Sequence, residues 1–360
     1  MPLPPPDPFL RLKARGAASN GAGRFEPYES IRESDGWDIP EDERLLRTEV
    51  SEERPRSVLS RNTSPDVPFD QSLNPYRGCE HGCIYCFARP SHGYLGLSGG
   101  LDFETRLVAR PTAPEVLARE LGRKAYVPKV LAIGTNTDPY QPIEARYRIM
   151  RRVLQVLSDW NHPVAIVTKG AMIERDVDIL GDMARRGLAS VGISVTTLDP
   201  ALSRRMEPRA PLPVRRLAAM RALAAAGVPV RVMVAPVVPV LTDRELERIL
   251  EAAKEAGAGT ASWILLRLPH EVAPLFRDWL ERVEPGKAAH VMNRLREMRG
   301  GKDYDAEWGQ RMRGSGLHAD LIAQRFRLAV ARLGLDQARP ALRTDLFAPP
   351  PRAGDQLSLF

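Results

Sequence analysis

The sequence predicts an α/β fold: a partial, TIM-like (βα)6 barrel with an extended N-terminal arm and a helical C-terminal segment. Apolar runs typical of buried parallel strands alternate five times with amphipathic stretches over residues 129–283. The amphipathic stretch at 113–126 requires one further strand before it, which gives six strand–helix units. Six units are too few to close a standard eight-stranded barrel, so we expect an open one.

Residues 1–69 are expected to form the arm, because they are rich in proline, glycine and charge and show no sustained periodicity. The barrel is expected over 70–283, with polar residues at the carboxyl ends of its strands, where active sites lie in such sheets. In order, its elements are helix 113–126, strand 129–135, helix 143–160, strand 163–169, helix 174–186, strand 189–197, helix 212–227, strand 228–239, helix 242–257 with Thr242 as N-cap, and strand 261–268. Residues 284–340 are expected to be helical and basic, and 341–360 to be a flexible tail whose proline runs prevent regular structure.

The composition limits the class of protein. Because 43% of the residues are hydrophobic, the chain can bury a sizeable core, which excludes a disordered or fibrous protein. The sequence shows neither an export signal nor an apolar run of roughly 18 residues, so we expect a soluble protein that does not bind membranes. Three cysteines cannot form a disulfide framework, and we therefore expect a reducing, cytoplasmic location.

The net charge of +7 is weak evidence for a nucleic-acid partner. Only seven of the 52 Lys+Arg residues are lysine, an arginine bias that a GC-rich genome produces without selection for a ligand. Residues 1–60 hold 9 Lys+Arg against 12 Asp+Glu, so the remaining 300 residues carry +10. The basic surface therefore belongs to the folded body.

All three cysteines, Cys79, Cys83 and Cys86, lie within eight residues. Spacings of three and two residues suit a loop that folds around a compact inorganic cluster, and Gly78 and Gly82 permit the tight turns. A fully protein-bound [4Fe–4S] cluster needs four thiolates. Since the chain offers three, one iron would stay open to a small molecule.

The CxxxCxxC pattern, with Tyr85 before its last cysteine and six strand–helix units around it, resembles the radical S-adenosylmethionine (SAM) superfamily. Closer similarity is carried by NPYRGCEHGCIYCFAR, GTNTDPYQPIE, VTKG, ISVTTLDPALSRRMEPRAP and VAPVVPVLTD. These segments resemble the branch of spore photoproduct lyase, a DNA-repair enzyme. The resemblance implies a [4Fe–4S] cluster whose open iron holds SAM, reductive cleavage of SAM to a 5′-deoxyadenosyl radical, and a flavodoxin or ferredoxin-type electron donor.

The resemblance also implies roles for single residues. Tyr85 would cover the adenine of SAM, while Lys169 and Ser194 would hold its carboxylate, for which a lysine is chemically suited. The alternative for Lys169 is a solvated cation at a strand end. Glu207 and Arg209 would fix the ribose or amino group, or pair with each other. The resemblance also places contacts to SAM or substrate at Asn136, Asp138, Tyr140 and Gln141. The alternative is that these residues form an ordinary turn without a binding role.

The hydrogen donor differs from the one in the resembled branch. Spore photoproduct lyase returns a hydrogen atom from a cysteine near the position of Asn136, and this chain has no cysteine outside the cluster loop. Either a tyrosine donates (Tyr94, Tyr140 or Tyr147), or SAM is regenerated, or the reaction differs.

Residues 356–360, QLSLF, place large apolar side chains in a proline-broken segment, where they need a partner. The peptide resembles the pentapeptide by which bacterial DNA polymerases and repair proteins bind the sliding clamp. That resemblance assigns clamp contacts to Gln356, Leu357, Leu359 and Phe360. The alternative is that the tail covers an apolar patch on its own barrel. A weaker echo at 344–347 lacks the leading glutamine.

Together these features predict a radical SAM enzyme, lyase-like, that acts on damaged or modified DNA and is recruited by the clamp. One alternative keeps the radical chemistry but assigns RNA, a peptide or a small metabolite as substrate. Another is a zinc-binding adaptor without enzymatic activity, in which His81 or His92 completes a site with the three cysteines.

Overall fold

Six parallel strands build the central sheet of the computed structural model, which describes residues 3, 10–21, 25, 44–337 and 341–350. They are β5 (Gln71–Leu73), β8 (Leu131–Ile133), β9 (Val164–Thr168), β10 (Ala189–Ser194), β11 (Val230–Val237) and β12 (Thr260–Leu265). A short strand, β4 (Ser60–Arg61), pairs antiparallel with β5, which gives the order β12-β11-β10-β9-β8-β5-β4. Because β12 and β4 are the two edges of this sheet, the described strands form an open barrel, and the expected fold class is confirmed.

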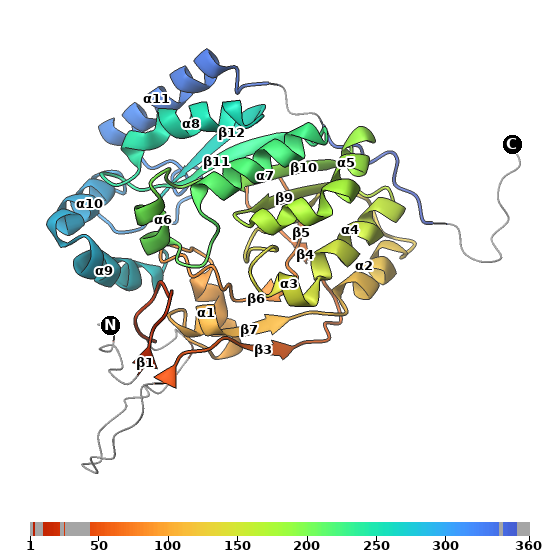
Figure 1. Cartoon of the computed structure of the whole chain (residues 1–360), viewed down its shortest axis with the longest axis horizontal. Coiled ribbons are helices and arrows are strands. Elements are labelled where there is room, and N and C mark those ends of the chain that lie inside the picture. Colours follow the sequence, from red (N-terminus) through yellow and green to blue (C-terminus); the bar gives the residue numbers. More distant parts are fainter. Residues whose placement is uncertain (1–2, 4–9, 22–24, 26–43, 338–340, 351–360) are drawn as a thin grey trace, which may run out of the picture.

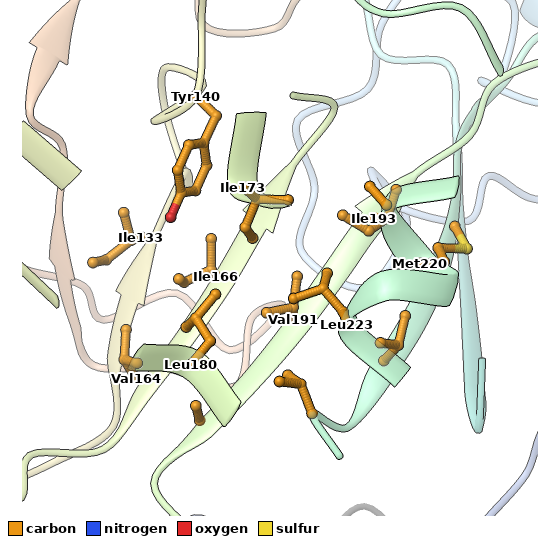
Figure 2. Packing of buried hydrophobic residues seen from close by; sticks show 14 of the residues in the cluster. Ile133, Tyr140, Val164, Ile166, Ile173, Leu180, Val191, Ile193, Met220 and Leu223 are labelled. Carbon is orange, nitrogen blue, oxygen red and sulfur yellow. The ribbon is translucent and has the colours of Figure 1, made fainter. Parts of the chain in front are cut away.

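Helices cover the outer face of the sheet (Figure 1). They are α2 (Ala113–Leu121), α4 (Ile149–Asp159), α5 (Val177–Arg185), α7 (Pro213–Ala225) and α8 (Leu246–Glu255). Strand side chains alternate between the two faces. Val164 and Ile166 are buried together with Leu180 and Ile173 of the covering segments (Figure 2), whereas Val167 lines a pocket on the inner face. The inner face therefore keeps room for a site.

The region expected to be an extended arm contributes strands of its own. β1 (Leu10–Arg11) pairs with β2 (Arg44–Leu45). β3 (Glu49–Glu52) pairs with β7 (Arg106–Ala109), which in turn pairs with β6 (Tyr76–Arg77), so a second small sheet forms beside the barrel. Strands of two to four residues are too short to show the alternation on which sequence patterns depend.

The helix expected over 143–160 is interrupted, so the expectation of one continuous helix is wrong. α3 (Glu144–Tyr147) ends at Arg148, whose φ of 50° lies in the left-handed region. The Glu144 carboxylate then accepts hydrogen bonds from the backbone N–H groups of Ile149 and Met150, at 3.0 and 3.1 Å. A carboxylate at this position satisfies N–H groups that the first turn of α4 leaves free.

Two other helices begin with 3-10 turns, η2 (Ala171–Asp176) before α5 and η3 (Asp243–Glu245) before α8. Thr242 occupies the N-cap position of η3, as expected, but its side chain does not cap the helix. Its hydroxyl accepts the backbone N–H of Val238 at 2.9 Å, which is on the preceding turn, and makes no capping hydrogen bond to the helix.

After β12 the chain continues with α9 (Val272–Val283), α10 (Pro285–Glu297) and α11 (Leu317–Leu333), which lies against α8 (Figure 1). The remaining short helices are η1 (Arg89–Leu95), α1 (Asp102–Thr105) and α6 (Pro200–Met206). Residues 298–316 form a loop, although this stretch was expected to be helical. Its glycines at 300, 301, 309, 314 and 316 all have positive φ, which a helix does not allow. None of the described helices is long and apolar enough to cross a membrane.

Part of the expected flexible tail packs on the body. Phe347 stacks on Trp160 with ring centroids 5.9 Å apart and also contacts the rings of Tyr126 and His162, each at 5.6 Å. The weaker echo of the clamp peptide thus covers an apolar patch of its own barrel. The residues predicted to contact the clamp, Gln356, Leu357, Leu359 and Phe360, lie outside the described residues.

Candidate cofactor pocket

A pocket opens at the carboxyl ends of the parallel strands. Its wall comes from the cysteine loop and from the ends of β8, β9, β10, β11 and β12. Parallel strands end at one edge of a sheet, so segments far apart in the sequence meet there. Eight of the predicted cluster and SAM residues line the pocket together: Cys79, Cys83, Tyr85, Cys86, Asn136, Asp138, Lys169 and Ser194.

Buried contacts hold the cysteine loop. Gly78 and Gly82 have φ of 73° and 65°, and a β-carbon at Gly82 would lie 2.7 Å from the Glu104 carboxylate. The buried Arg89 donates to the carbonyl oxygen of Cys83 at 2.9 Å and forms an ion pair with Glu104 at 2.5 Å. Neither residue of this pair was predicted from the sequence, although Arg89 lies within the quoted motif.

The three thiols are desolvated. Burial raises the pKa of Cys79 and of Cys86, and it raises the pKa of Cys83 to about 12. Thiolates persist in such surroundings only beside a strong positive charge, which a bound metal group supplies. The donor set therefore fits a group that binds three thiolates and brings its own positive charge.

The geometry fits an iron–sulfur cluster better than zinc. His81 Nδ1 lies 3.4 Å from Asp138 Oδ2, and His92, which does not line the pocket, has its Nε2 3.0 Å from the carbonyl oxygen of Arg106. Within the described residues, no three Cys, His, Asp or Glu side chains are placed to hold a single metal ion. Zinc needs four ligands at about 2.0–2.3 Å from one ion, whereas the thiolates of a cluster bind separate irons.

Asp138 ties the pocket wall together. Its carboxylate accepts hydrogen bonds from Thr168 Oγ1 at 2.6 Å and from the backbone N–H groups of Lys169 and Tyr140, at 2.7 and 2.9 Å. Burial alone would raise the pKa of Asp138, but His81 and these hydrogen bonds outweigh burial and lower it to about 2. Asp138 therefore positions the end of β9 and the cysteine loop, a role that the sequence analysis did not assign.

A buried network lies behind Tyr85. The Glu207 carboxylate pairs with Arg216 and accepts the hydroxyl of Tyr85. Burial alone would raise the pKa of Glu207, but Arg216 above all lowers it to about 2. The alternative in which Glu207 pairs with Arg209 is wrong, because Arg209 pairs with Glu80 at 3.2 Å. Neither Glu207 nor Arg209 lines the pocket, and Glu207 instead fixes the ring that does.

Lys169 lies over the ring of Tyr85, with Nζ 5.7 Å from the ring centroid. No carboxylate in the described part of the chain forms an ion pair with its ammonium group. Ser194 Oγ donates to the carbonyl oxygen of Ala235 at 3.0 Å, and its two lone pairs remain free to accept. An unpaired ammonium group beside a hydroxyl at one end of a pocket suits the carboxylate of a bound molecule.

The structure does not bring the three candidate hydrogen donors to the pocket. Tyr94 is 71% exposed. Tyr140 points into the core, where its hydroxyl donates to Asp176 (Figure 2), and Tyr147 packs against the same core. None of the three therefore lies where the cofactor pocket is, and the identity of the hydrogen donor stays a prediction. Among the tyrosines that the structure describes, Tyr85 is the one that lines the pocket.

Two residues without a predicted role form the rim of the pocket near β12. Phe87, the residue after Cys86, is 46% exposed, and the guanidinium of Arg267 lies over its ring at 5.0 Å from the centroid. Both side chains line the pocket. Arg267 belongs to the polar end of a predicted strand, which was the available sequence signal. We call this pair the Phe87–Arg267 rim.

Three desolvated thiols, an unpaired lysine and a tyrosine fixed by Glu207 lie at the carboxyl edge of an open parallel barrel. This combination is typical of an iron–sulfur enzyme with a small charged cofactor. The chain belongs to the radical SAM superfamily, whose sequence model matches residues 73–253. This superfamily uses a [4Fe–4S] cluster and SAM, and the bound pair supplies reductive cleavage of SAM. In this chain Cys79, Cys83 and Cys86 would hold the cluster.

Relatives with similar sequences share the fold region but carry no stated activity. The chain is 39% identical over 234 residues to the uncharacterized protein Rv2578c of Mycobacterium tuberculosis, which covers 64% of this chain and 68% of that protein. It is 25% identical over 173 residues to the uncharacterized protein MJ0683 of Methanocaldococcus jannaschii, covering 48% and 62%.

Solved structures of spore photoproduct lyase have a similar fold. The lyase complexed with dinucleoside spore photoproduct matches with a TM-score of 0.56 and 14% identity, over 79% of each chain. A variant with bound AdoMet and dinucleoside spore photoproduct matches with a TM-score of 0.55 and 15% identity, over 79% of this chain and 78% of that one. At such identity the likeness establishes the shared fold.

Proposed function

We propose that this protein is a repair-type, lyase-like enzyme that directs radical SAM chemistry at DNA. The observation that carries the proposal is a pocket lined by eight of the predicted cluster and SAM residues, within a fold similar to that of spore photoproduct lyase, which has been solved with dinucleoside spore photoproduct. The +10 charge of residues 61–360 gives additional support, since a basic body lowers the cost of approaching a polyanion.

The pocket residues divide the work of binding. The Lys169 ammonium group and the Ser194 hydroxyl hold the carboxylate end of the cofactor, and the ring of Tyr85, held by Glu207, flanks it. Asp138 fixes the position of Lys169 relative to the cysteine loop, because it binds the backbone N–H of Lys169 and lies against His81 of that loop. Orientation of this kind is what the protein contributes when the cofactor carries the difficult chemistry.

The reaction ends without a cysteine hydrogen donor, because all three cysteines belong to the cluster loop. Repair of spore photoproduct by the cysteine route is therefore not part of the proposal. The substrate is instead a damaged or modified base in DNA.

The proposal is tested by anaerobic incubation of the reconstituted enzyme with dithionite and SAM. Parallel reactions contain ultraviolet-irradiated DNA, undamaged DNA of the same sequence, RNA, or no nucleic acid. The release of 5′-deoxyadenosine is expected to rise with irradiated DNA, and deuterium from labelled DNA is expected in that product. Equal release in all four reactions, or the highest release with RNA, contradicts a DNA substrate.

The same proposal includes a cytoplasmic enzyme that is reduced by a flavodoxin or ferredoxin-type donor and recruited by the sliding clamp through QLSLF. Deletion of residues 356–360 is expected to abolish binding to a purified bacterial clamp while SAM cleavage continues. The control is Thr344→Ala, which alters the weaker echo without removing the packed ring of Phe347. Unchanged clamp binding after the deletion removes the clamp from the proposal.

A further inference from the structure

Arg267 lines the pocket at the carboxyl end of β12, near the buried Arg299, while the guanidinium of Arg313 lies over the ring of Trp263 at 4.8 Å from its centroid. Arg267 follows the strand, while Arg299 and Arg313 come from the 298–316 loop. No carboxylate forms an ion pair with any of the three in the described part of the chain. The guanidinium of Arg299 is 1% exposed and donates to backbone carbonyl oxygens only, at 2.8 and 3.0 Å. Burial and then the charge of Arg267 lower the pKa of Arg299 to about 10.

The carboxylates nearest to Arg267 and Arg299 are engaged elsewhere. Asp66 accepts hydrogen bonds from Arg311 and from the backbone N–H of Gly309. Asp305 accepts the backbone N–H of Glu307 at 2.9 Å. The charges of Asp66 and Asp305 act on Arg267 and Arg299 through space, but neither carboxylate forms an ion pair with them. An anion at the rim would therefore meet a guanidinium group that has no direct carboxylate partner among the described residues.

Of these arginines, Arg267 is the one that faces the pocket. One of its terminal nitrogens lies 3.5 Å from Met312 Sδ and the other 3.4 Å from the hydroxyl of Tyr304, which are weak contacts for a cation. Its Nε is buried without a hydrogen-bond partner among the described residues. The guanidinium plane is thus held over Phe87 while most of its hydrogen-bonding capacity is unused.

Phe87 supplies the second half of the site. Its ring is 46% exposed at the rim, directly beside the cluster loop, although an aromatic ring of this size is normally covered. A flat exposed ring beside a guanidinium group provides a stacking surface for a nucleobase and a donor for its phosphate. A base inside duplex DNA cannot reach atoms in such a pocket, so it has to leave the stack.

We propose that the Phe87–Arg267 rim binds an unpaired nucleotide of DNA, with the base stacked on Phe87 and the adjoining phosphodiester on Arg267. This inference rests on the proposed function and deepens it, because it names the part of DNA that the pocket accepts. Arg299 adds positive potential behind the phosphate.

The test is fluorescence anisotropy with the cluster-loaded enzyme and two labelled DNA duplexes, one fully paired and one with a single unpaired thymine. The wild type is expected to prefer the second duplex. Phe87→Ala is expected to reduce that preference at least fivefold, because stacking on an aromatic ring contributes about 1–3 kcal/mol per base. Phe87→Leu, which keeps apolar bulk without a flat ring, is expected to behave like Phe87→Ala.

Arg267→Ala is expected to weaken both complexes and to reduce the slope of log affinity against log salt by about 1. Arg267→Lys keeps the charge and is expected to restore the slope. The matched control is Arg152→Ala, since Arg152 is on the outer helix α4 and pairs with Glu115 at 2.7 Å. Cluster absorbance shows that each variant is folded.

Two results overturn the inference alone: equal binding of the two duplexes by the wild type, or an unchanged preference in Phe87→Ala. A stronger preference for the matching RNA also overturns it. If DNA fails to stimulate SAM cleavage by the wild type, the proposed function fails, whatever the variants bind. The two failures are therefore distinguishable.

Discussion

The two ends of the pocket differ in how their charges are balanced. At the end formed by the cysteine loop, β8 and β9, the buried arginines and carboxylates pair within the chain, Arg89 with Glu104 and Glu207 with Arg216, and the Lys169 ammonium group is left for the cofactor. At the end formed by β12, Arg267 and Arg299 have no carboxylate partner in the described residues. A balanced site is rigid before binding and suits a cofactor that never changes, while an unbalanced site is completed by its ligand. If the proposed function holds, the cofactor and the substrate bind at different ends of the pocket.

The largest effect is expected at the balanced end, from Cys83→Ala. Two thiolates do not retain the cluster, so iron content and SAM cleavage are expected to fall to background. Ser203→Ala is the control, because Ser203 is buried and its hydroxyl has no partner among the described residues. Iron analysis and visible absorbance of both variants measure the difference. A Cys83→Ala protein with a full cluster contradicts the assignment.

Removal of one partner from a balanced pair is expected to be the next largest effect. Arg216→Ala leaves the Glu207 carboxylate buried and unpaired, which costs about 3–5 kcal/mol of unfolding free energy. The neighbouring Arg215→Ala removes an exposed ion pair with Glu174 at 3.3 Å and is expected to cost about 0–1 kcal/mol. Urea unfolding compares them, and equal losses would falsify the special status of the buried pair.

The balanced end also predicts a pH dependence. Asp138 and Glu207 both have pKa values of about 2 in the folded chain, below the ordinary values of 3.8 and 4.5. As the pH falls, the unfolded chain binds these protons before the folded chain does. The stabilisation is therefore complete above about pH 5 and is lost as the pH falls toward 2. For Asp138 the loss of unfolding free energy is roughly 2 kcal/mol. Urea unfolding at pH 7, 5 and 3 measures it. Asp138→Asn is expected to be less stable at pH 7 and to lose less stability by pH 3.

The smallest effect is expected at the unbalanced end. Arg267→Ala removes a cation that forms no ion pair with a carboxylate of the described residues, so the free energy of unfolding is expected to change by less than about 1 kcal/mol. Urea unfolding beside Arg216→Ala provides the measurement. A loss of several kcal/mol in Arg267→Ala contradicts the contrast between the two ends.

Sequence patterns predicted the parts of the molecule that depend on repetition. Strand–helix alternation predicted the open barrel. The cysteine spacing, the strand ends and the resemblance to the radical SAM superfamily together predicted eight residues of the pocket wall. The break at Arg148 could not be predicted, because it depends on the local bonds of Glu144. The N-terminal strands were too short to show a pattern.

Partnerships between distant residues were also beyond the sequence. Glu207 and Arg209 are neighbours in the chain, but each pairs with a residue from another element, Arg216 and Glu80. Tyr140 follows a strand end, yet its ring turns into the core (Figure 2). Which way a side chain turns at the end of a strand depends on the loops that pack there, and a single sequence does not reveal this.

The packing of Phe347 has a consequence for the reach of the clamp peptide. Trp160 and His162 precede β9, so Phe347 is fixed at the amino end of the strands, across the sheet from the pocket. The N–H of Ala348 donates to the carbonyl oxygen of Trp160 at 3.1 Å. Gln356 is eight residues after Ala348 in the sequence, so the chain can place it at most about 29 Å from Ala348. If residues 356–360 bind the clamp as proposed, the pocket at the carboxyl edge of the sheet would face away from the point where the enzyme is attached.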